Sequence, residues 1–361
     1  MKTVYIVDAI GIHCGMHYYG DSFRTLLREN GIDSKILSNY SDSDFSPFFR
    51  NIYEGNLLSK LYKLAISCLK LLFKVIIDKK SVYLVFSYGT PIDFILLIIT
   101  MISRRCIIDV HEVIMQGSEN NKTLRRMFSY IYKRTKHVII HSKRSEDILK
   151  DIGFKGQIIS VPHFEYQTRD KYDISRVSID VQRLINDKLN LLWFGNITYS
   201  KGIDLYIDCI NALPKEIKGK INVIIAGRSL DGVFEKCNVS NSVFSIKIKR
   251  LNDDEMSYLY SRSDYVVLPY RQTSQSGVLE MAFHYKKPVL VSNIPYFSMM
   301  LSKYPSFGKV ISFEEGFFEK ILESLTNDSY KYYSEEDVYK YTHREENIKF
   351  VNDFKQIISI I

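Results

Sequence analysis

The chain of 361 residues is 46% hydrophobic and 25% charged, which is typical of a globular protein with one or two domains. Its five cysteines are scattered and none pairs at C-x-x-C spacing, so we expect neither a disulfide framework nor a zinc site. We expect the protein to work in a reducing compartment. The net charge of +8 lies mostly in residues 1–170, where 24 Lys and Arg face 17 Asp and Glu, and this basic half predicts an anionic partner such as a membrane surface or a nucleic acid.

The first half alternates between strand-like and helix-like segments. A β-rich run at residues 3–10, "TVYIVDAI", is followed by the turn "GIHCG" and the amphipathic segment "DSFRTLLREN". Further strands are predicted at 81–87, 106–112, 137–142 and 157–163, and helices at 57–76, 91–103, 122–134 and 143–151. This alternation predicts βαβ units and a parallel sheet.

Neither apolar stretch of this half predicts export or a membrane span. The apolar start contains Asp8 and runs into a glycine turn without a cleavage site, unlike a secretory signal peptide. The longest apolar run, 94–103, is much shorter than the roughly 20 residues needed to cross a bilayer. We expect a buried helix there.

The same alternation restarts in the second half, with strands predicted at 189–195, 221–227, 243–248, 265–270 and 288–292 and helices at 202–213, 253–263 and 277–285. We therefore predict an α/β protein with two Rossmann-like, doubly wound parallel-sheet domains, at 1–168 and 188–333, joined by a polar linker at 169–187. A final helix within 334–361 is expected to pack back on the first domain. Ligands of such sheets bind at the carboxyl ends of the strands, here in a cleft between the domains.

Two strand-to-helix loops of the second half suit a phosphate. In "LLWFGNITYSKGIDLYI" (191–207), Gly195 permits close backbone approach, and Lys201 adds a charge beside the free N–H groups of a helix start. In "LPYRQTSQSGVLE" (268–280), the N–H groups of Ser276, Gly277 and Val278 begin the next helix. Each loop has a plainer interpretation: a βα turn with a surface lysine, or a helix whose Ser276 is only an N-cap.

Glu280 lies in the first turn of that second helix, where its carboxylate is placed to accept hydrogen bonds from vicinal hydroxyls, or to serve only as a favourable acid at a helix start. Two phosphate-type helix starts with a nearby carboxylate suit one ligand, a nucleoside diphosphate that carries a sugar.

The ordered segments "FGNI…KGID", "IIAG", "SRSDYVVLPY" and "SGVLEMAFHYKKPVLVS", with "DVHE" and "SVPHF" in the first half, resemble glycosyltransferase family 4. The resemblance covers most of the chain and is strongest over 191–292. It implies the GT-B fold and a retaining transfer of a sugar from a UDP- or GDP-sugar, without a required metal or cofactor, in synthesis of surface polysaccharide such as O-antigen, capsule or exopolysaccharide.

The resemblance also implies roles for single residues. Lys201 corresponds to the family's diphosphate-binding lysine and Glu280 to the glutamate that holds the ribose, with Gly195 in the first loop. Two positions depart from the pattern: Gln272 stands where the family has a glutamate that touches the transferred sugar, and Asn196 where it often has an arginine. We expect Gln272 to hydrogen-bond a sugar hydroxyl.

Cations near the second-domain loops are candidates to replace the missing arginine at Asn196. Arg228 follows the strand at 221–227, and Arg271 follows the strand at 265–270. Either guanidinium would restore a positive charge beside the donor diphosphate.

The first half contributes a second set of candidates. In "GIHCGMHYYGDS", Gly11 and Gly15 would let the backbone approach the donor, and His13 and His17 are candidates for acceptor contacts, unless all are structural. His111 of "DVHE" matches the family's active-site histidine near the reacting sugar. The predicted catalytic residues are therefore His111, Lys201 and Gln272.

Two basic segments, 57–80 and 122–144, predict contact with an anionic membrane. The second holds eight Lys and Arg and no acid, and aromatic residues are interleaved in it. A lipid-linked acceptor would explain such a surface at the cytoplasmic face of the plasma membrane, whereas a solvated helix face is the plainer alternative. No motif that reads nucleic acid is present.

Two other functions remain open at this point. One is a nucleotide-sugar epimerase of the GT-B type. The other is a non-catalytic nucleotide-sugar-binding relative, which Gln272 and Asn196 support.

Overall fold

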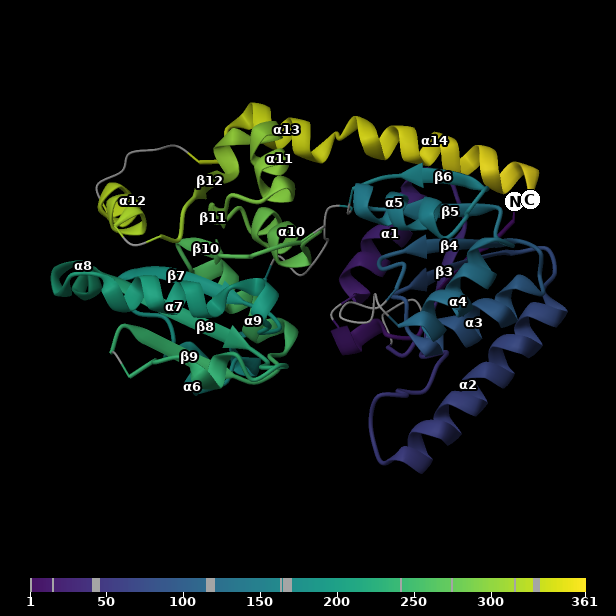
Figure 1. Cartoon of the computed structure of the whole chain (residues 1–361), viewed down its shortest axis with the longest axis horizontal. Coiled ribbons are helices and arrows are strands. Elements are labelled where there is room, and N and C mark those ends of the chain that lie inside the picture. Colours follow the sequence, from purple (N-terminus) through teal and green to yellow (C-terminus); the bar gives the residue numbers. More distant parts are fainter. Residues whose placement is uncertain are drawn as a thin grey trace. The chain divides into compact units, whose positions relative to one another are not determined.

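The computed structural model describes residues 2–14, 16–40, 46–114, 121–162, 164, 171–240, 242–273, 275–314, 316–326 and 332–361. The chain divides into two compact units (Figure 1): unit 1 comprises Met1–Gln167 and Arg344–Ile361, and unit 2 comprises Thr168–His343. Each unit holds a six-stranded sheet whose strand pairs are all parallel. The predicted fold class of two doubly wound α/β domains is confirmed.

Unit 1 has the sheet order β2-β1-β3-β4-β5-β6. Its strands are β1 (Val4–Asp8), β2 (Ser34–Ser38), β3 (Val82–Ser87), β4 (Cys106–Val110), β5 (His137–Ile140) and β6 (Gln157–Ser160). Its helices are α1 (His17–Glu29), α2 (Leu57–Ile77), α3 (Pro91–Met101), α4 (Lys122–Tyr132), α5 (Lys143–Asp151) and α14 (Glu345–Ile360), with a 3-10 turn, η1, at Gly11–Cys14. Sequence periodicity missed only β2 among these strands.

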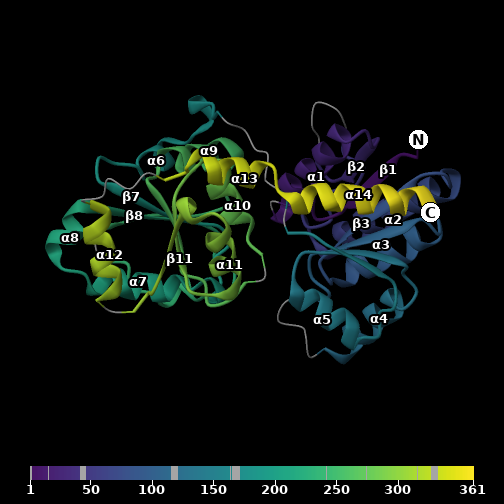
Figure 2. The same cartoon turned by 90° about the horizontal axis from the view of Figure 1, so that it is seen from above.

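Both faces of the unit 1 sheet are covered, which explains why β1 and β3 are buried along their whole length. Helices α2 to α5 pack on one face, with Leu71 and Phe128 in its core. Helix α1 covers the other face, and Figure 2 shows α14 running beside it. The ring of Phe350 in α14 packs against that of Phe23 in α1, with centroids 5.5 Å apart and planes tilted by 57°. The C-terminal helix therefore belongs to the core of unit 1.

Unit 2 has the sheet order β12-β11-β10-β7-β8-β9. Its strands are β7 (Leu189–Phe194), β8 (Ile221–Gly227), β9 (Phe244–Ile248), β10 (Tyr265–Leu268), β11 (Val289–Ser292) and β12 (Gly308–Ile311). Its α-helices are α6 (Ile179–Gln182), α7 (Ile203–Ala212), α8 (Lys215–Lys220), α9 (Asp253–Arg262), α10 (Gly277–His284), α11 (Pro295–Lys303), α12 (Phe317–Thr326) and α13 (Glu335–Thr342).

The periphery of unit 2 differs from the sequence-based picture. Helix α6 lies inside the stretch predicted as a linker, 169–187, and the last helix predicted within 334–361 is two helices, α13 in unit 2 and α14 in unit 1. The core is as the strand pattern indicates: α7 and α12 cover one face of the sheet, where Trp193 is fully buried.

Three glycines hold the loops of unit 2 against one another. Gly195, Gly202 and Gly227 have φ of 118°, 62° and 148°, a region that side chains rarely adopt. A Cβ at Gly227 would lie 1.8 Å from the carbonyl oxygen of Gly195, and one at Gly202 would lie 1.9 Å from that of Pro269. The loop after β7 therefore needs glycine to reach the ends of β8 and β10.

Gly202→Ala should lower the free energy of unfolding of unit 2 by at least about 2 kcal/mol, because the left-handed backbone and the overlap with Pro269 both oppose a side chain. Fluorescence of Trp193, the only tryptophan of the chain, reports this unfolding in urea. Gly219→Ala in α8 is the matched control, since a Cβ there meets no atom within 4 Å. Equal losses in the two variants would contradict the packing argument.

Candidate functional sites

The two loops that the sequence singled out meet at one point of unit 2. Strands β7 and β10 are neighbours in the sheet, and the chain leaves them toward opposite edges. Such a reversal of strand order is where doubly wound sheets bind ligands, beyond the carboxyl ends of the strands. Gly195 follows β7 and Tyr270 follows β10, so both loops begin at this edge.

The ammonium group of Lys201 lies where these loops converge. A Cβ built on Gly195 would be 3.4 Å from Lys201 Nζ and 3.3 Å from Val278 Cγ2. Nζ also lies 5.2 Å from the ring centroid of Tyr270. Lys201 is half-buried, and no acid, carbonyl or hydroxyl of the described residues hydrogen-bonds its ammonium group. A half-buried cation without an acidic partner suits an anionic ligand.

The start of α10 lies at the same place. Ser276 is the N-cap, and its side chain accepts a hydrogen bond from Leu279 N at 3.2 Å, so the plainer interpretation of this hydroxyl holds. Gly277 and Val278 are the first residues of the helix, and their N–H groups belong to its positive end. Gln272, in the loop before the helix, is exposed.

The two candidate arginines differ in their partners. Arg271 makes a bidentate ion pair with Asp204, both N–O distances being 2.7 Å, and lies over the ring of Tyr199. Partial burial works to raise the pKa of Asp204, but hydrogen bonds from Arg271 hold it below its usual value. Arg271 therefore anchors the loop before α7.

Arg228, in contrast, is half-buried at the end of β8, and its buried Nε has no hydrogen-bond partner in the described part of the chain. Asn196, also half-buried, follows Gly195 in the loop after β7, the strand that pairs with β8. Of the two arginines, Arg228 is the one without an ion pair to a described acid.

Glu280 lies deeper than the sequence indicates. Its side chain is fully buried, and the hydroxyl of Tyr341 in α13 donates a hydrogen bond to Oε2. Tyr341 is itself enclosed by Phe283 and Phe307 at ring-centroid distances of 5.5 and 5.4 Å. The Tyr341 hydroxyl therefore fixes the orientation of this buried carboxylate.

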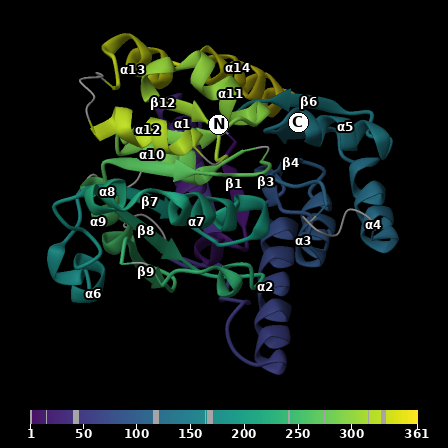
Figure 3. The same ribbon diagram turned by 60° about the vertical axis from the view of Figure 1, so that its left-hand side comes forward.

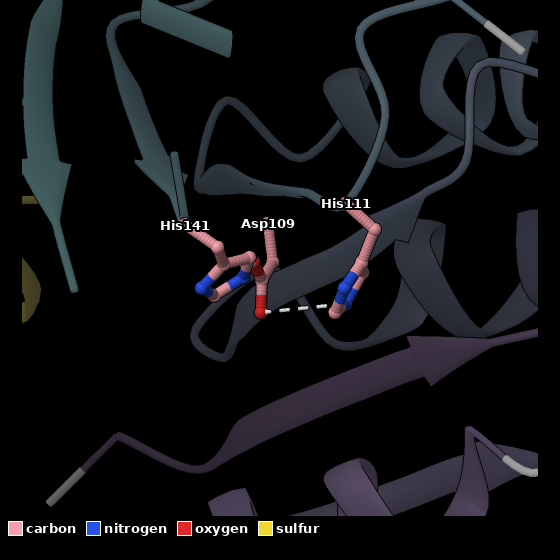
Figure 4. Close-up of side chains that lie close together, drawn as sticks. All are labelled: Asp109, His111 and His141. Carbon is pink, nitrogen blue, oxygen red and sulfur yellow. Dashed lines mark hydrogen bonds and ion pairs between the residues drawn. The ribbon is translucent and has the colours of Figure 1, made fainter. Parts of the chain in front are cut away.

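A buried polar cluster lies at the strand ends of unit 1 (Figure 4). His141 Nε2 is 2.6 Å from Asp109 Oδ1, and His111 Nε2 is 4.0 Å from Asp109 Oδ2. The hydroxyl of Tyr19 donates to Asp109 Oδ2 at 2.8 Å. The ring of His111 stacks on that of Tyr88, with centroids 5.0 Å apart and planes at 13°. His111 is therefore held between an aromatic ring and a buried carboxylate.

Asp109, His111 and His141 together have the composition of a metal site, and their ligand atoms lie within 4.8 Å of one another. The 2.6 Å between His141 Nε2 and Asp109 Oδ1 fits a hydrogen bond better, because ligand atoms around a tetrahedral zinc lie roughly 3.3 Å apart when each bond is about 2.0 Å. Nδ1 of His141 donates to the carbonyl of Val161 at 2.9 Å, which fixes the ring. We interpret the cluster as a hydrogen-bonded support for His111.

The first loop of unit 1 holds the remaining candidates. Gly15 lies outside the described residues, and so does the side chain of His13. His17 is buried at the start of α1, with its ring 5.5 Å from that of Tyr40. A Cβ on Gly11 would lie 2.3 Å from Asn39 Oδ1, so this glycine serves packing against the loop after β2.

Sequence reasoning did not single out Asp8, which has an unusual environment. It is the last residue of β1 and 1% exposed, and the N–H groups of Ile10 and Gly11 donate to its Oδ1 at 3.1 and 2.9 Å. Its Oδ2 is buried and has no hydrogen-bond partner in the described part of the chain. The signal in the sequence was an acid within an otherwise apolar strand segment, three residues before the glycine of the turn.

The chain is similar to a known protein family and to solved structures. Residues 188–327, which lie within unit 2, match the family model of glycosyl transferases group 1. No curated protein sequence matches the chain. The match and the fold together support a glycosyltransferase.

Solved structures resemble the whole chain. Sucrose-phosphate synthase from Thermosynechococcus elongatus has a TM-score of 0.60 at 13% identity, over 100% of this chain and 97% of that one. The Anabaena protein HepE, in complex with UDP and glucose, has a TM-score of 0.61 at 15% identity, over 100% of both chains. UDP-GlcNAc 2-epimerase from Methanocaldococcus jannaschii has a TM-score of 0.56 at 14% identity, over 99% and 100%. At such identities the likeness shows the fold alone, and the GT-B fold expected from the sequence is confirmed.

Asp8→Asn should stabilise unit 1 more at pH 8 than at pH 5. Burial raises the pKa of Asp8 from 3.8 to about 7, against the lowering effect of the N–H groups of Gly11 and Ile10. Between about pH 4 and 7 the folded chain keeps a proton that the unfolded chain releases, so wild-type stability falls across this window by up to about 4 kcal/mol. Asparagine does not titrate and avoids this loss.

Urea unfolding of both full-length proteins, followed by circular dichroism at pH 5 and pH 8, measures the difference. Comparing the variant with wild type cancels the titration of the neighbouring Asp93, whose pKa burial also raises, to about 6. An Asp8→Asn effect that is the same at both pH values would contradict the assignment of a buried, proton-binding carboxyl group.

Proposed function

We propose that this protein is a retaining glycosyltransferase that moves a sugar from a UDP- or GDP-sugar to a lipid-linked glycan acceptor in surface polysaccharide synthesis. The observation that carries the proposal is the ammonium of Lys201, which has no hydrogen-bond or ion-pair partner among the described residues. It lies beside Gly195 and the start of α10, within the segment that matches glycosyl transferases group 1. HepE, which shares the fold, is a protein solved with UDP and glucose.

The chemistry of the reaction explains this arrangement. Cleavage of the bond between a sugar and a diphosphate leaves negative charge on the departing phosphate. Lys201, Arg228 and the N–H groups of Gly277 and Val278 would stabilise that charge, and fixed donors of this kind act most strongly where water is excluded. No metal is required in this scheme, because protein cations supply the charge.

The sugar itself would be recognised by neutral groups. Gln272 offers an amide that both donates to and accepts from a sugar hydroxyl. His111 would contact the reacting sugar from unit 1, with Asp109 and Tyr88 fixing its ring. Glu280 would accept from the ribose hydroxyls. His13 and His17 remain proposed acceptor contacts.

A nucleotide-sugar epimerase is the second candidate, because the Methanocaldococcus jannaschii epimerase shares the fold over the whole chain. A panel of UDP- and GDP-sugars separates the two. Free nucleoside diphosphate released only when membrane lipid extract is added supports the transferase, and a changed sugar without an acceptor supports the epimerase. If calorimetry detects binding of no UDP- or GDP-sugar, both activities are rejected.

Unit 1 supports the membrane part of the proposal in two places. Helix α2 exposes an apolar surface, with Leu58 78%, Phe73 67% and Ile77 67% exposed, and Figure 3 shows this helix extending past α3. Such a surface beside lysines suits the interface of a bilayer. None of the described helices is long and apolar enough to span a membrane.

The second place is a depression of about 570 Å³ at α4 and the end of α5, lined by Lys122, Arg125, Arg126, Ser129, Tyr130, Lys133, Arg134, Asp151 and Ile152. Five of these nine side chains are cations, and only Arg125 among them pairs with the single acid, Asp151. A lipid phosphate would meet a positive field here. We propose that both surfaces dock the enzyme on the cytoplasmic face of the plasma membrane.

Lys201→Ala should reduce turnover by about 100-fold or more, the scale of removing one electrostatic contact to a transition state. Release of nucleoside diphosphate with the best donor of the panel measures it. Lys215→Ala, which removes an exposed lysine of α8 in the same unit, is the control and should keep wild-type turnover. Unchanged turnover in Lys201→Ala would reject the role of this ammonium group.

Reversing the charges of Arg125 and Arg126 to Glu should weaken binding to phosphatidylglycerol vesicles about thirtyfold or more, at about 1 kcal/mol for each cation near an anionic surface. Co-sedimentation at low and high salt measures it, because added salt screens the same attraction. Reversal of Lys215 and Lys220 in unit 2 gives the same change of net charge and should leave binding intact. If the wild-type protein does not sediment with these vesicles, the membrane proposal fails.

A further inference from the structure

The carboxyl group of Asp8 is supported by the fold on one oxygen only. The turn after β1 gives Oδ1 two backbone N–H donors, from Ile10 and Gly11. Oδ2 is buried and receives no hydrogen bond from the described residues. A buried oxygen left without a donor costs free energy, because water had hydrogen-bonded it before folding.

Asp93 shows what a purely structural acid looks like in the same unit. It is also buried, but its Oδ2 accepts hydrogen bonds from the N–H groups of Tyr88 and Thr90, both at 2.9 Å, as part of the capping box of α3. The local structure gives Asp93 a role as the capping acid of α3. It does not account for the second oxygen of Asp8.

The position of Asp8 points to a ligand. Strands β1 and β3 are neighbours from which the chain leaves toward opposite edges, so the end of β1 is the ligand-binding edge of the unit 1 sheet. Tyr88, directly after β3, places its hydroxyl 3.5 Å from Asp8 Oδ1, and its ring stacks on His111, directly after β4. Asp8, Tyr88 and His111 thus stand on three adjacent strand ends.

We propose that Asp8 is a sugar-positioning residue, whose Oδ2 accepts a hydrogen bond from a hydroxyl of the sugar that His111 contacts. The proposal rests on the proposed function and adds to it the residue of unit 1 that orients the sugar. A sugar hydroxyl is a neutral donor that fits a buried carboxylate oxygen without bringing a second charge. Because burial raises the pKa of this carboxyl group to about 7, it is an acceptor in neutral to alkaline solution.

Asp8→Asn in the full chain is the discriminating variant. The amide oxygen can keep the two hydrogen bonds from Ile10 and Gly11, whereas the NH₂ group that replaces Oδ2 no longer accepts. Calorimetry at pH 8 with UDP, GDP and their hexose conjugates compares the affinity that the sugar adds to the nucleotide. A second arm uses saturation-transfer NMR with methyl hexosides, which probe an acceptor sugar.

We expect Asp8→Asn to keep the affinity for the free nucleotide and to lose about 10- to 100-fold in one arm, the usual effect of one hydrogen bond to a charged group. Loss of the gain from the nucleotide-linked hexose assigns Asp8 to the donor sugar, and loss of the methyl hexoside signal assigns it to the acceptor sugar. Asp93→Asn, which removes another buried acid of unit 1, should change neither.

The two proposals fail differently. If the wild-type protein binds no nucleotide and no nucleotide-sugar, the proposed function is wrong and the role of Asp8 falls with it. If the wild-type protein binds them and Asp8→Asn matches it in both arms, only the assignment of Asp8 is overturned. A variant that unfolds more easily than wild type at pH 8 would also contradict it, since the unpartnered carboxylate would then be stabilising.

Discussion

The backbone contact between the strand ends of unit 2 is the constraint on which the candidate donor site depends. At Gly227 and Gly202 a methyl group would overlap the carbonyls of Gly195 and Pro269, so the loop after β7 lies directly on the ends of β8 and β10. Lys201 immediately precedes Gly202, and its ammonium group consequently reaches the first turn of α10 beside Val278. A cation and a helix start from different parts of the chain meet because glycine removes the side chains that would separate them.

The distribution of paired and unpaired charge separates scaffold from site. Arg271 forms an ion pair with Asp204 and anchors the loop before α7. The carboxylate of Asp93 caps the start of α3. Lys201, Arg228 and Asp8 each keep a buried or half-buried polar atom without a partner among the described residues. All three lie at the carboxyl ends of strands, where doubly wound sheets bind ligands. A ligand that hydrogen-bonds these atoms would offset the free energy lost when they are buried without partners.

Hydrophobic periodicity predicted most of both sheets because parallel strands buried on two faces, such as β3 and β8, are continuous apolar runs. It missed β2, whose sequence Ser34–Ser38 is half polar, and β12, which begins at a glycine. The glycine and lysine signals of the donor loops were also readable, since they depend on local spacing. Contacts between residues distant in sequence could not be predicted. The sequence near Arg271 does not indicate its pairing with Asp204, and the sequence near Glu280 does not indicate its hydrogen bond with Tyr341, 61 residues later.

Gln272 stands where the motif of the family that the chain resembles has a glutamate. This difference is a weak argument against catalysis. Transfer requires stabilisation of the charge that develops on the diphosphate, and this work belongs to cations and N–H groups. Gln272 would touch hydroxyls that carry no charge, so replacing a carboxylate there changes which hydroxyl pattern is recognised. Lys201 and Arg228 have no acidic partners among the described residues and suit the diphosphate of the proposed donor, so Gln272 by itself does not argue against the proposed transfer.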